Sequence, residues 1–146
     1  MPAALLADRG VVKVAGVESV AFLQGLVTND VANLPEPEGR YAALLTPQGK
    51  IVVDFLLSPA VDDLGGGFFI DAPRALCADL VTRLTRYRLR AKVSIEDLSS
   101  SISVVAAWDA DERPQVVGDI YRDPREARLG WRIFCVESEV ARIVAR

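Results

Sequence analysis

One carboxylate in this sequence lies where a charge needs a reason. Asp54 stands within residues 51–57, and the other six residues of that segment are apolar, as in a buried strand. An isolated charge in an apolar setting is costly unless it is paired or hydrogen-bonded. Two interpretations therefore stay open. Asp54 bonds a neighbouring backbone amide or arginine, or it faces a cavity that holds something polar.

The residues around Asp54 predict a β-hairpin. Residues 40–46 and 51–58 have the composition of strands, and Gly49 occupies the turn position that needs a positive φ angle. Side chains alternate along a strand, so Asp54 lies on one face only. The opposite face is wholly apolar and should be buried; it comprises Ile51, Val53, Phe55 and Leu57. The Asp54 face is the one that can line a pocket.

The composition excludes several kinds of site. The chain of 146 residues contains no histidine, which rules out a histidine-based triad or general base. Its two cysteines, Cys77 and Cys135, are far apart and form no CxxC motif. A zinc site needs more ligands of this type, so no metal site is predicted. Any chemistry must rely on carboxylates, amides, hydroxyls, thiols or a bound cofactor.

Charge and hydropathy limit the classes of binding partner and the cellular compartment that the sequence predicts. The formal net charge of −3 argues against direct nucleic-acid binding by bulk charge. No apolar run approaches the ~18 residues of a membrane span, so no membrane partner is predicted. The first ten residues lack the basic region and apolar core of a secretory signal. Together these features predict a cytoplasmic protein.

The basic residues are unevenly placed along the chain. Residues 73–92 hold six of them and one acid, whereas the rest of the chain is acidic. Arg83, Arg86 and Arg90 share one face of a predicted helix. They provide favourable charge near a helix C-terminus, or they form a docking patch for RNA or an acidic partner. Tyr87 is the only nearby aromatic residue, so stacking on single-stranded RNA is poorly supported.

Outside the hairpin, short strands alternate with helices. The order and the antiparallel neighbours predict an α+β fold, with a mixed, mostly antiparallel sheet, two crossover helices and a part that is ferredoxin-like. Asp71 lies just ahead of Pro73 and suits the start of the second helix. The other predicted helices are 17–27 and 138–146. The other predicted strands are 11–15, 68–72, 91–98, 101–108, 130–137 and a short one at 116–117.

Several pieces of the sequence, in order, resemble one family. The most specific are "FLQGLVTNDV" followed by "LLTPQGKIVVDFLL", with "RLTRYRLRAKVSIEDLS" further on. Together they resemble the N-terminal part of the folate-binding YgfZ-type proteins, relatives of the glycine-cleavage T-protein in the aminomethyltransferase family. The family hallmark of the form Lys-Gly-Cys-Tyr-x-Gly-Gln-Glu is absent. We therefore expect residues 1–146 to be an N-terminal portion without the C-terminal part.

The resemblance implies a role for Asp54. In the T-protein relatives the matching hairpin carries a catalytic strand aspartate close to the reactive end of the folate. Asp54 occupies that position, which implies that it is both a catalytic and a cofactor-binding residue, with tetrahydrofolate as the cofactor. A carboxylate accepts hydrogen bonds from the N–H groups of a pterin. It also stabilises positive charge that develops on a folate nitrogen during one-carbon transfer.

The resemblance also implies what the protein does. It implies a tetrahydrofolate-binding accessory protein in iron–sulfur cluster assembly or repair, with effects on tRNA modification. The implied partners are folate and iron–sulfur proteins. The alternative is an aminomethyl or one-carbon transferase of the T-protein kind, and a plainer third option is a structural or partner-binding module. The lack of a recognisable complete site argues against catalysis by this chain alone.

Four residues ahead of the hairpin are further candidates for folate binding. Thr28, Asn29 and Asp30 follow a predicted helix directly. They end the helix through an Asx turn, or they border the folate channel. Gln24 either hydrogen-bonds the ligand or faces solvent.

The end of the chain predicts an apolar stripe on a helix. Its members are Val136, Val140, Ile143 and Val144. Exposed contiguous apolar patches favour association. We therefore expect self-association or a loosely packed final helix, unless the stripe folds back on the sheet.

Overall fold

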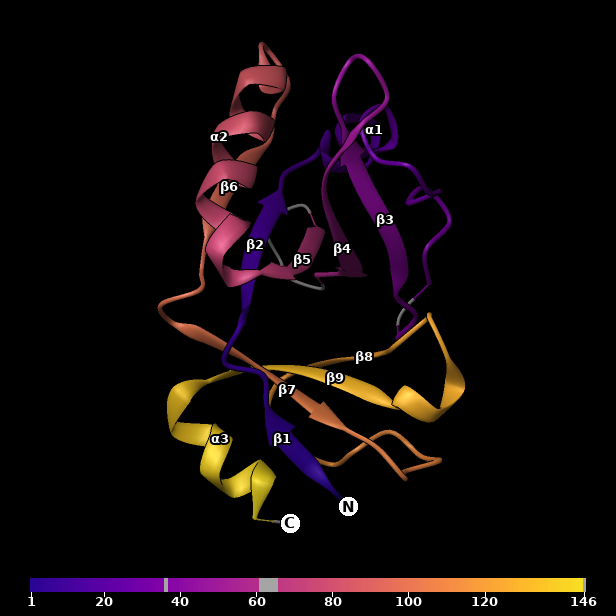
Figure 1. Cartoon of the computed structure of the whole chain (residues 1–146), viewed down its shortest axis with the longest axis vertical. Coiled ribbons are helices and arrows are strands. Elements are labelled where there is room, and N and C mark those ends of the chain that lie inside the picture. The colour runs from indigo at the N-terminus through magenta and orange to yellow at the C-terminus, as the bar shows by residue number, and fades with distance from the viewer. Residues whose placement is uncertain (36, 61–65, 146) are drawn as a thin grey trace.

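Two antiparallel sheets lie one above the other along the long axis of the molecule (Figure 1). The computed structural model describes residues 1–35, 37–60 and 66–145. The five-stranded sheet has the order β3-β4-β5-β2-β6, with β2 Arg9–Ala15, β3 Arg40–Leu45, β4 Ile51–Pro59, β5 Gly67–Pro73 and β6 Ser94–Asp97. The four-stranded sheet has the order β1-β7-β9-β8, with β1 Ala3–Leu5, β7 Ile102–Ala107, β8 Asp119–Arg122 and β9 Trp131–Val136.

Three α-helices among the described residues accompany the sheets. They are α1 Ser19–Gln24, α2 Cys77–Arg88 and α3 Glu137–Val144, and two short 3₁₀ turns are η1 Arg74–Leu76 and η2 Ala127–Leu129. α2 buries Cys77, Leu80 and Leu84, whose spacing places them on one helical face. They pack with Phe55 and Ile70 in a core between α2 and one face of the five-stranded sheet. Burial raises the pKa of the Cys77 thiol, as befits a packing role.

A second core joins the two sheets. Leu56 and Phe69 of the five-stranded sheet pack with Val104, Tyr121 and Phe134 of the four-stranded sheet. The ring centroids of Phe69 and Phe134 lie 5.2 Å apart, and those of Tyr121 and Phe134 lie 5.4 Å apart. Aromatic pairs at these separations contribute stability beyond the area that they bury. The relative placement of the sheets thus rests on side-chain packing.

The predicted α+β class is confirmed, and so is the hairpin. β3 and β4 pair antiparallel, from Arg40 opposite Leu57 to Leu44 opposite Val53. The prediction that Ile51 is buried is wrong, because this side chain is 69% exposed. A register shift next to Leu44 breaks the two-residue alternation of side chains, so Ile51 no longer shares the apolar face of the strand. The other three members of that face, Val53, Phe55 and Leu57, are buried.

Other boundaries differ from the sequence-based expectations. Asp71 does not start a helix: it lies inside β5 and is completely buried, and Pro73 precedes the 3₁₀ turn η1. The short strand expected at 116–117 lies at Asp119–Arg122 instead, where it pairs with β9. The helix expected at 17–27 extends only from Ser19 to Gln24. Its shortness fits the presence of Gly25 at its end.

The final helix folds back on the four-stranded sheet. Ile143 is 1% exposed and packs with Trp131 and Ile133, and Val140 is half-buried beside them. Val136 and Val144 stay exposed. The expected stripe is therefore covered in part, and self-association stays a prediction. No helix among the described residues is long and apolar enough to span a bilayer.

Candidate functional site

Asp54 lies on the face of the five-stranded sheet that α2 does not cover. Its side chain is exposed, and its carboxylate accepts a hydrogen bond from the hydroxyl of Tyr41 on the neighbouring strand. In the strand register Asp54 is opposite Ala43, so Tyr41 is its diagonal neighbour on the same face. The hydrogen bond to Asp54, and to a smaller degree burial, raises the pKa of the Tyr41 phenol. The pair therefore presents a carboxylate beside a neutral phenol.

Two arginines complete a small cavity around this pair. The cavity of about 30 Å³ is lined by Arg9, Arg125, Tyr41, Asp54, Phe55 and Leu56. A space of this size holds about one or two water molecules. It is far smaller than the ~300–1,000 Å³ of typical ligand pockets. The described residues thus offer one polar wall of a site rather than an enclosed pocket.

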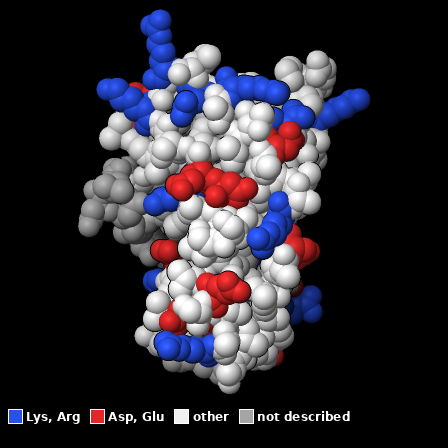
Figure 2. Space-filling model, turned by 90° about the vertical axis from the view of Figure 1, so that its left-hand side faces the viewer, with Lys and Arg blue, Asp and Glu red and all other residues white. Residues whose placement is uncertain are grey.

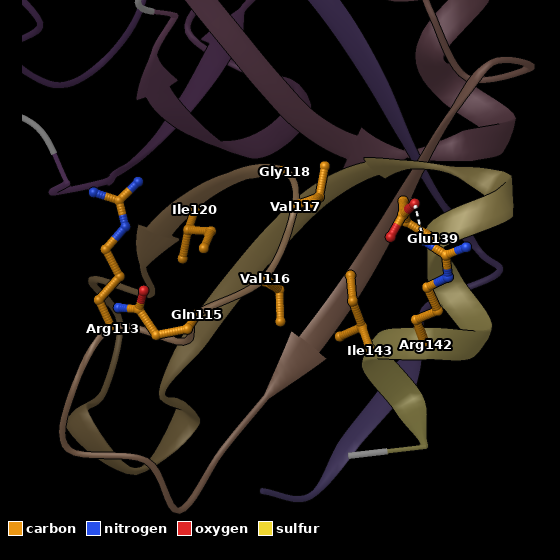
Figure 3. A pocket seen from close by; sticks show the side chains of 9 residues that line it. All are labelled: Arg113, Gln115, Val116, Val117, Gly118, Ile120, Glu139, Arg142 and Ile143. Carbon is orange, nitrogen blue, oxygen red and sulfur yellow. Dashed lines mark hydrogen bonds and ion pairs between the residues drawn. The ribbon is translucent and has the colours of Figure 1, made fainter.

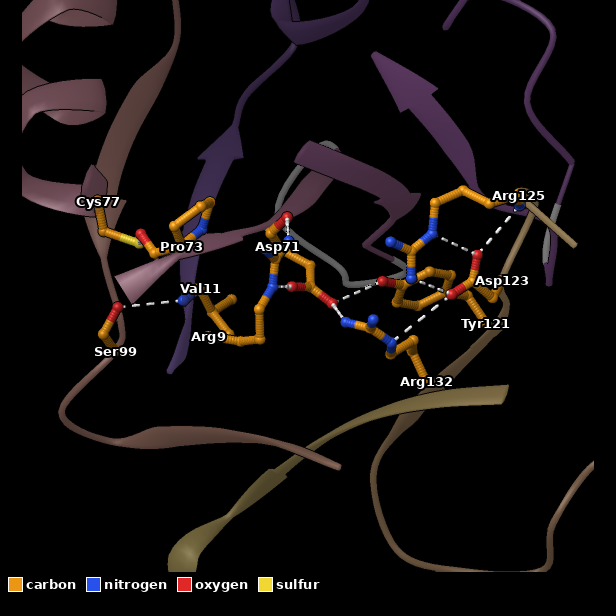
Figure 4. A network of polar contacts seen from close by, with 10 residues as sticks. All are labelled: Arg9, Val11, Asp71, Pro73, Cys77, Ser99, Tyr121, Asp123, Arg125 and Arg132. Atoms are coloured by element: carbon orange, nitrogen blue, oxygen red, sulfur yellow. Dashed lines mark hydrogen bonds and ion pairs between the residues drawn. The ribbon is translucent and has the colours of Figure 1, made fainter. Parts of the chain in front are cut away.

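A buried carboxylate holds the first of these arginines in place (Figure 4). Asp71 is completely buried, and its Oδ1 accepts a hydrogen bond of 2.7 Å from Nε of Arg9. Its Oδ2 accepts hydrogen bonds of 2.8 Å from the Tyr121 hydroxyl and from Nη1 of Arg132. Arg9 also donates to the backbone oxygen of Asp71 at 2.7 Å. A buried charge needs this degree of pairing.

A second buried carboxylate holds the other arginine. Asp123 accepts two side-chain hydrogen bonds from Arg125, 2.6 Å from Nη2 and 3.0 Å from Nε. Such bidentate pairs fix a guanidinium in one orientation. Burial raises the pKa of Asp123, but the hydrogen bonds and charge of Arg125 outweigh it and leave that pKa below its ordinary value. The hydrogen bonds that Arg125 donates to Asp123 likewise raise the pKa of Arg125.

Arg132 connects the two carboxylates. Its Nη1 bonds Asp71, and its Nε lies 3.7 Å from Oδ2 of Asp123 (Figure 4). Tyr121 stays a phenol, because burial and the neighbouring charge of Asp71 raise its pKa well above the ordinary value. The network joins β2 and β5 of one sheet to β8 and β9 of the other. It can therefore position Arg9 and Arg125 beside Asp54.

Two of the four candidate residues ahead of the hairpin bond the exposed edge of β3. Thr28 Oγ1 accepts a hydrogen bond of 2.9 Å from the backbone N–H of Ala43. Asn29 Nδ2 donates to the backbone oxygen of Tyr41 at 3.0 Å. Asn29 is thus brought next to the Tyr41–Asp54 pair through the backbone of β3.

The other two candidates bond the backbone of the loop that follows α1. Gln24 Oε1 accepts hydrogen bonds from the N–H groups of Val31 at 2.8 Å and Ala32 at 3.1 Å. Asp30 Oδ1 accepts from Ala32 at 2.9 Å. For Asp30 the interpretation as a turn residue is therefore sufficient. Gln24 is exposed, as one of its two interpretations expected, and its side chain also bonds the backbone of its own loop. Their role in ligand binding stays a prediction.

A larger hollow lies elsewhere, beside α3 (Figure 3). It measures about 590 Å³ and has Val116, Ile120 and Ile143 in its lining, together with Arg113 and Arg142. None of the residues predicted for the folate site lines it. Among the described residues, no group of three or more acidic, cysteine or histidine side chains is placed to hold a metal ion.

Local sequence patterns did not reveal the roles of five residues of this network: Arg9, Asp71, Tyr121, Asp123 and Arg125. One signal was available for Asp71, which stands after Phe68, Phe69 and Ile70 as Asp54 stands among its apolar neighbours. The following proline favoured the interpretation as a helix start. No local pattern marks Arg9 and Tyr121, because their partner Asp71 lies 62 and 50 positions away. Asp123 and Arg125 stand only two positions apart, but nothing in the local sequence shows that they pack beside the other sheet.

No known family model matches the sequence. Two similar proteins are iron–sulfur cluster assembly factors named IBA57. The mitochondrial homologue from Mycosarcoma maydis is 33% identical over 94% of this chain and 37% of its own length. The mitochondrial human protein is 31% identical over 88% of this chain and 41% of its own length. The chain is similar in sequence to the IBA57 assembly factors over most of its length. It spans about two-fifths of their length.

The fold is also found in a solved structure. The glycine cleavage system aminomethyltransferase T from Bartonella henselae superposes with a TM-score of 0.77 over 99% of this chain and 44% of that protein. The sequence identity is 18%, so the likeness concerns the fold alone. It confirms the expected T-protein-like fold.

The expectation of a cytoplasmic protein is wrong. The IBA57 relatives from Mycosarcoma maydis, Homo sapiens and Mus musculus are all named as mitochondrial. The expectation rested on the lack of a secretory pattern in the first ten residues. That pattern distinguishes secreted proteins from others and does not separate the compartments inside a cell.

Proposed function

We propose that this chain is part of an iron–sulfur cluster assembly factor that binds tetrahydrofolate. The observation that supports the role in iron–sulfur cluster assembly is the 33% identity, over 94% of the chain, to an IBA57 homologue. Iron–sulfur proteins are the partners that this role implies, and effects on tRNA modification follow through them. The T-protein fold supports the folate half of the proposal.

The exposed carboxylate of Asp54 is the proposed contact to the pterin. It is the acceptor on the open face of β4, it already accepts one bond from Tyr41, and it has room for a second donor. The neighbouring guanidinium groups of Arg9 and Arg125 are fixed by buried carboxylates. A preorganised polar wall of this kind binds a ligand without the cost of ordering its side chains on binding.

The rest of the pocket is proposed to come from the part of the relatives that lies outside the match. The cavity at Asp54 is about 30 Å³, too small to enclose a pterin. In this proposal residues 1–146 are the N-terminal portion, with Thr28, Asn29, Asp30 and Gln24 along the border of the folate channel. Tetrahydrofolate then binds this chain weakly, and a chain of the relatives' full length tightly.

Calorimetric titration with tetrahydrofolate tests the proposal. In the full-length chain Asp54→Asn should weaken binding by about ten- to hundredfold, since a hydrogen bond to a charged group contributes about 1.5–3 kcal/mol. Asp79→Asn is the matched control, because Asp79 is an exposed carboxylate on α2. This helix packs on the face of the sheet opposite to that of Asp54. Equal affinities in the two variants would remove Asp54 from the site.

A transferase of the T-protein kind is the second candidate, favoured by the TM-score of 0.77. In that function Asp54 stabilises positive charge on a folate nitrogen during transfer of an aminomethyl-derived carbon. The discriminating measurement is formation of 5,10-methylenetetrahydrofolate by the full-length chain with an aminomethyl donor. Turnover that Asp54→Asn abolishes favours the transferase; folate binding without turnover favours the accessory factor.

A further inference from the structure

One end of the long axis carries three exposed aliphatic side chains on three separate turns. Leu89 is 87% exposed, Val17 is 75% exposed and Ile51 is 69% exposed. Leu89 follows the last residue of α2, Val17 precedes α1, and Ile51 begins β4 directly after the hairpin turn. Figure 1 shows the end of α2, the helix α1 and the turn between β3 and β4 together at the upper end of the molecule.

Cations surround these side chains. Arg86, Arg88, Arg90 and Lys92 are exposed at the end of α2, and Lys50 is exposed on the hairpin turn. In Figure 2 the blue side chains gather at the upper end, whereas the acidic ones lie mostly lower on the same face. One acid at this end is Glu18, whose carboxylate accepts a 3.0 Å hydrogen bond from the Lys92 backbone. The end is therefore positive on a protein with a net charge of −3.

Leu89 is held outward by an unfavourable backbone conformation. The Ala91 N–H donates to the Arg88 oxygen at 2.8 Å, which closes a four-residue turn. Leu89 has φ 47° and ψ −108°, close to the first central position of a type II′ turn, where glycine predominates. Leucine at this position is disfavoured by its conformation and also by its exposure. A function that needs this projecting side chain explains why the unfavourable backbone conformation and the exposure of Leu89 occur together.

We propose that this end docks on the surface of an anionic lipid bilayer. Val17, Ile51 and Leu89 would enter the boundary between headgroups and acyl chains, and the five cations would face the lipid phosphates. Interfacial binding of this kind needs exposed apolar side chains and nearby Lys and Arg, and no spanning segment. The absence of a long apolar run, which argued against a membrane span, does not bear on it.

The arrangement fits a lipid surface better than a nucleic acid or a protein. Single-strand binding needs several stacking aromatic rings, and Tyr87 is the ring exposed near the end of α2. A protein interface has a contiguous apolar centre, whereas here the aliphatic residues stand on separate projecting turns. Isolated aliphatic tips match a fluid anionic surface, with Lys50 next to Ile51 and with Arg88 and Arg90 on either side of Leu89.

Vesicle co-sedimentation tests the charged part of the proposal. The chain should bind vesicles of phosphatidylcholine and phosphatidylglycerol at equal parts, bind pure phosphatidylcholine poorly, and dissociate as NaCl is raised. Arg88→Gln with Arg90→Gln should lower the partition coefficient about 25-fold, from about 1 kcal/mol for each cation. Arg128→Gln is the control, because that side chain is 90% exposed on η2, which connects β8 and β9 of the other sheet. Circular dichroism verifies that each variant folds.

Site-directed fluorescence tests the aliphatic part. Cys77 and Cys135 are buried, so a cysteine placed by Leu89→Cys can be labelled selectively with an NBD fluorophore. Its emission should shift to the blue and intensify on the anionic vesicles. Val117→Cys is the control, because Val117 is 68% exposed beside the four-stranded sheet. Equal responses at both positions, or none at position 89, would overturn the proposal.

A third comparison separates a lipid from an RNA surface. Leu89→Ser and Ile51→Ser should weaken vesicle binding about as clearly as the arginine changes do. If the serine variants bind vesicles unchanged while the arginine variants lose binding to vesicles and to a single-stranded RNA alike, the surface is a general polyanion site. That result would overturn insertion into lipid.

Discussion

Two tyrosine–aspartate pairs lie on the same face of the five-stranded sheet and differ in almost every other respect. Tyr41 and Asp54 form an exposed pair, with one hydrogen bond between them. Tyr121 and Asp71 form a buried pair, in which Asp71 also accepts bonds from Arg9 and Arg132. The same two side-chain types thus serve once as an open acceptor and once as the centre of a closed network.

The strand register explains the difference. Asp71 on β5 is opposite Leu56 on β4, and Asp54 lies two residues from Leu56 on the same face. The four-stranded sheet covers Leu56 and Asp71 but ends before Asp54. Distance from the junction between the sheets therefore decides which carboxylate is buried. A carboxylate at the edge of that junction stays available to a ligand while its neighbours are held rigid.

The largest expected effect comes from neutralising the buried carboxylate. Asp71→Asn leaves Arg9 without its charged partner and leaves Arg132 with only the more distant Asp123, at 3.7 Å, in a buried setting. Breaking a buried ion pair by removing one member costs about 3–5 kcal/mol. We expect a loss of this size in the free energy of unfolding, measured by urea denaturation at pH 7. Asp54→Asn is the control and should change the free energy of unfolding by less than about 0.5 kcal/mol.

The opposite ranking would contradict the comparison. If Asp54→Asn destabilised the fold as much as Asp71→Asn, the exposed pair would be a structural element. The proposed availability of Asp54 for a ligand would then lose its basis.

The two hydroxyls should show the same contrast on a smaller scale. Tyr121→Phe removes the donor to Oδ2 of a buried aspartate. Leaving a buried polar group with one partner fewer costs about 1–3 kcal/mol. Tyr41→Phe removes a bond that water can replace, so its effect on the free energy of unfolding should be close to zero. Thermal and urea unfolding of the two variants measures the difference, and equal losses would show that Tyr41 is structural as well.

Acid should weaken the junction through Asp123. Its pKa is lower in the folded than in the unfolded state, because the bonds from Arg125 outweigh burial. Its contribution to stability is therefore present above the unfolded pKa, near ~3.9, and is lost as the pH falls through the folded pKa. Urea unfolding between pH 7 and pH 2.5 should show Asp123→Asn less stable at neutral pH, with a smaller further loss in acid. A loss in acid identical to that of the unmodified chain would contradict this assignment.

The fold was predictable where the signal is local. Alternation and Gly49 indicated the hairpin of β3 and β4. The exposure of Ile51 was not predictable in the same way, because a register shift in one strand leaves no mark in the sequence pattern.

One residue of the candidate site, Asp54, could be predicted from the sequence, whereas the residues that surround it could not. The apolar neighbours of Asp54 suggested a buried charge, yet Asp71 is the buried one. The reason is that burial of a strand face depends on what packs against it, and the four-stranded sheet comes mainly from residues after position 101. Its arginine and tyrosine partners come from strands distant in sequence, so local reasoning could not assemble the network.

The smallest effect concerns the exposed pair itself. The hydrogen bond from Tyr41 to Asp54 is the first cause of the raised pKa of Tyr41, with burial second. Asp54→Asn removes the charged acceptor, so the pKa of Tyr41 should fall toward the ordinary value of about 10. An ultraviolet titration of phenolate absorbance measures this pKa, with Tyr41→Phe to identify the transition of Tyr41.

Tyr121 is buried and its pKa is raised well above the ordinary value, so it should not titrate before the fold unfolds in alkali. An unchanged Tyr41 transition in Asp54→Asn would show that the pair is not formed in solution. The acceptor proposed for a pterin would then lack the neighbour that orients it.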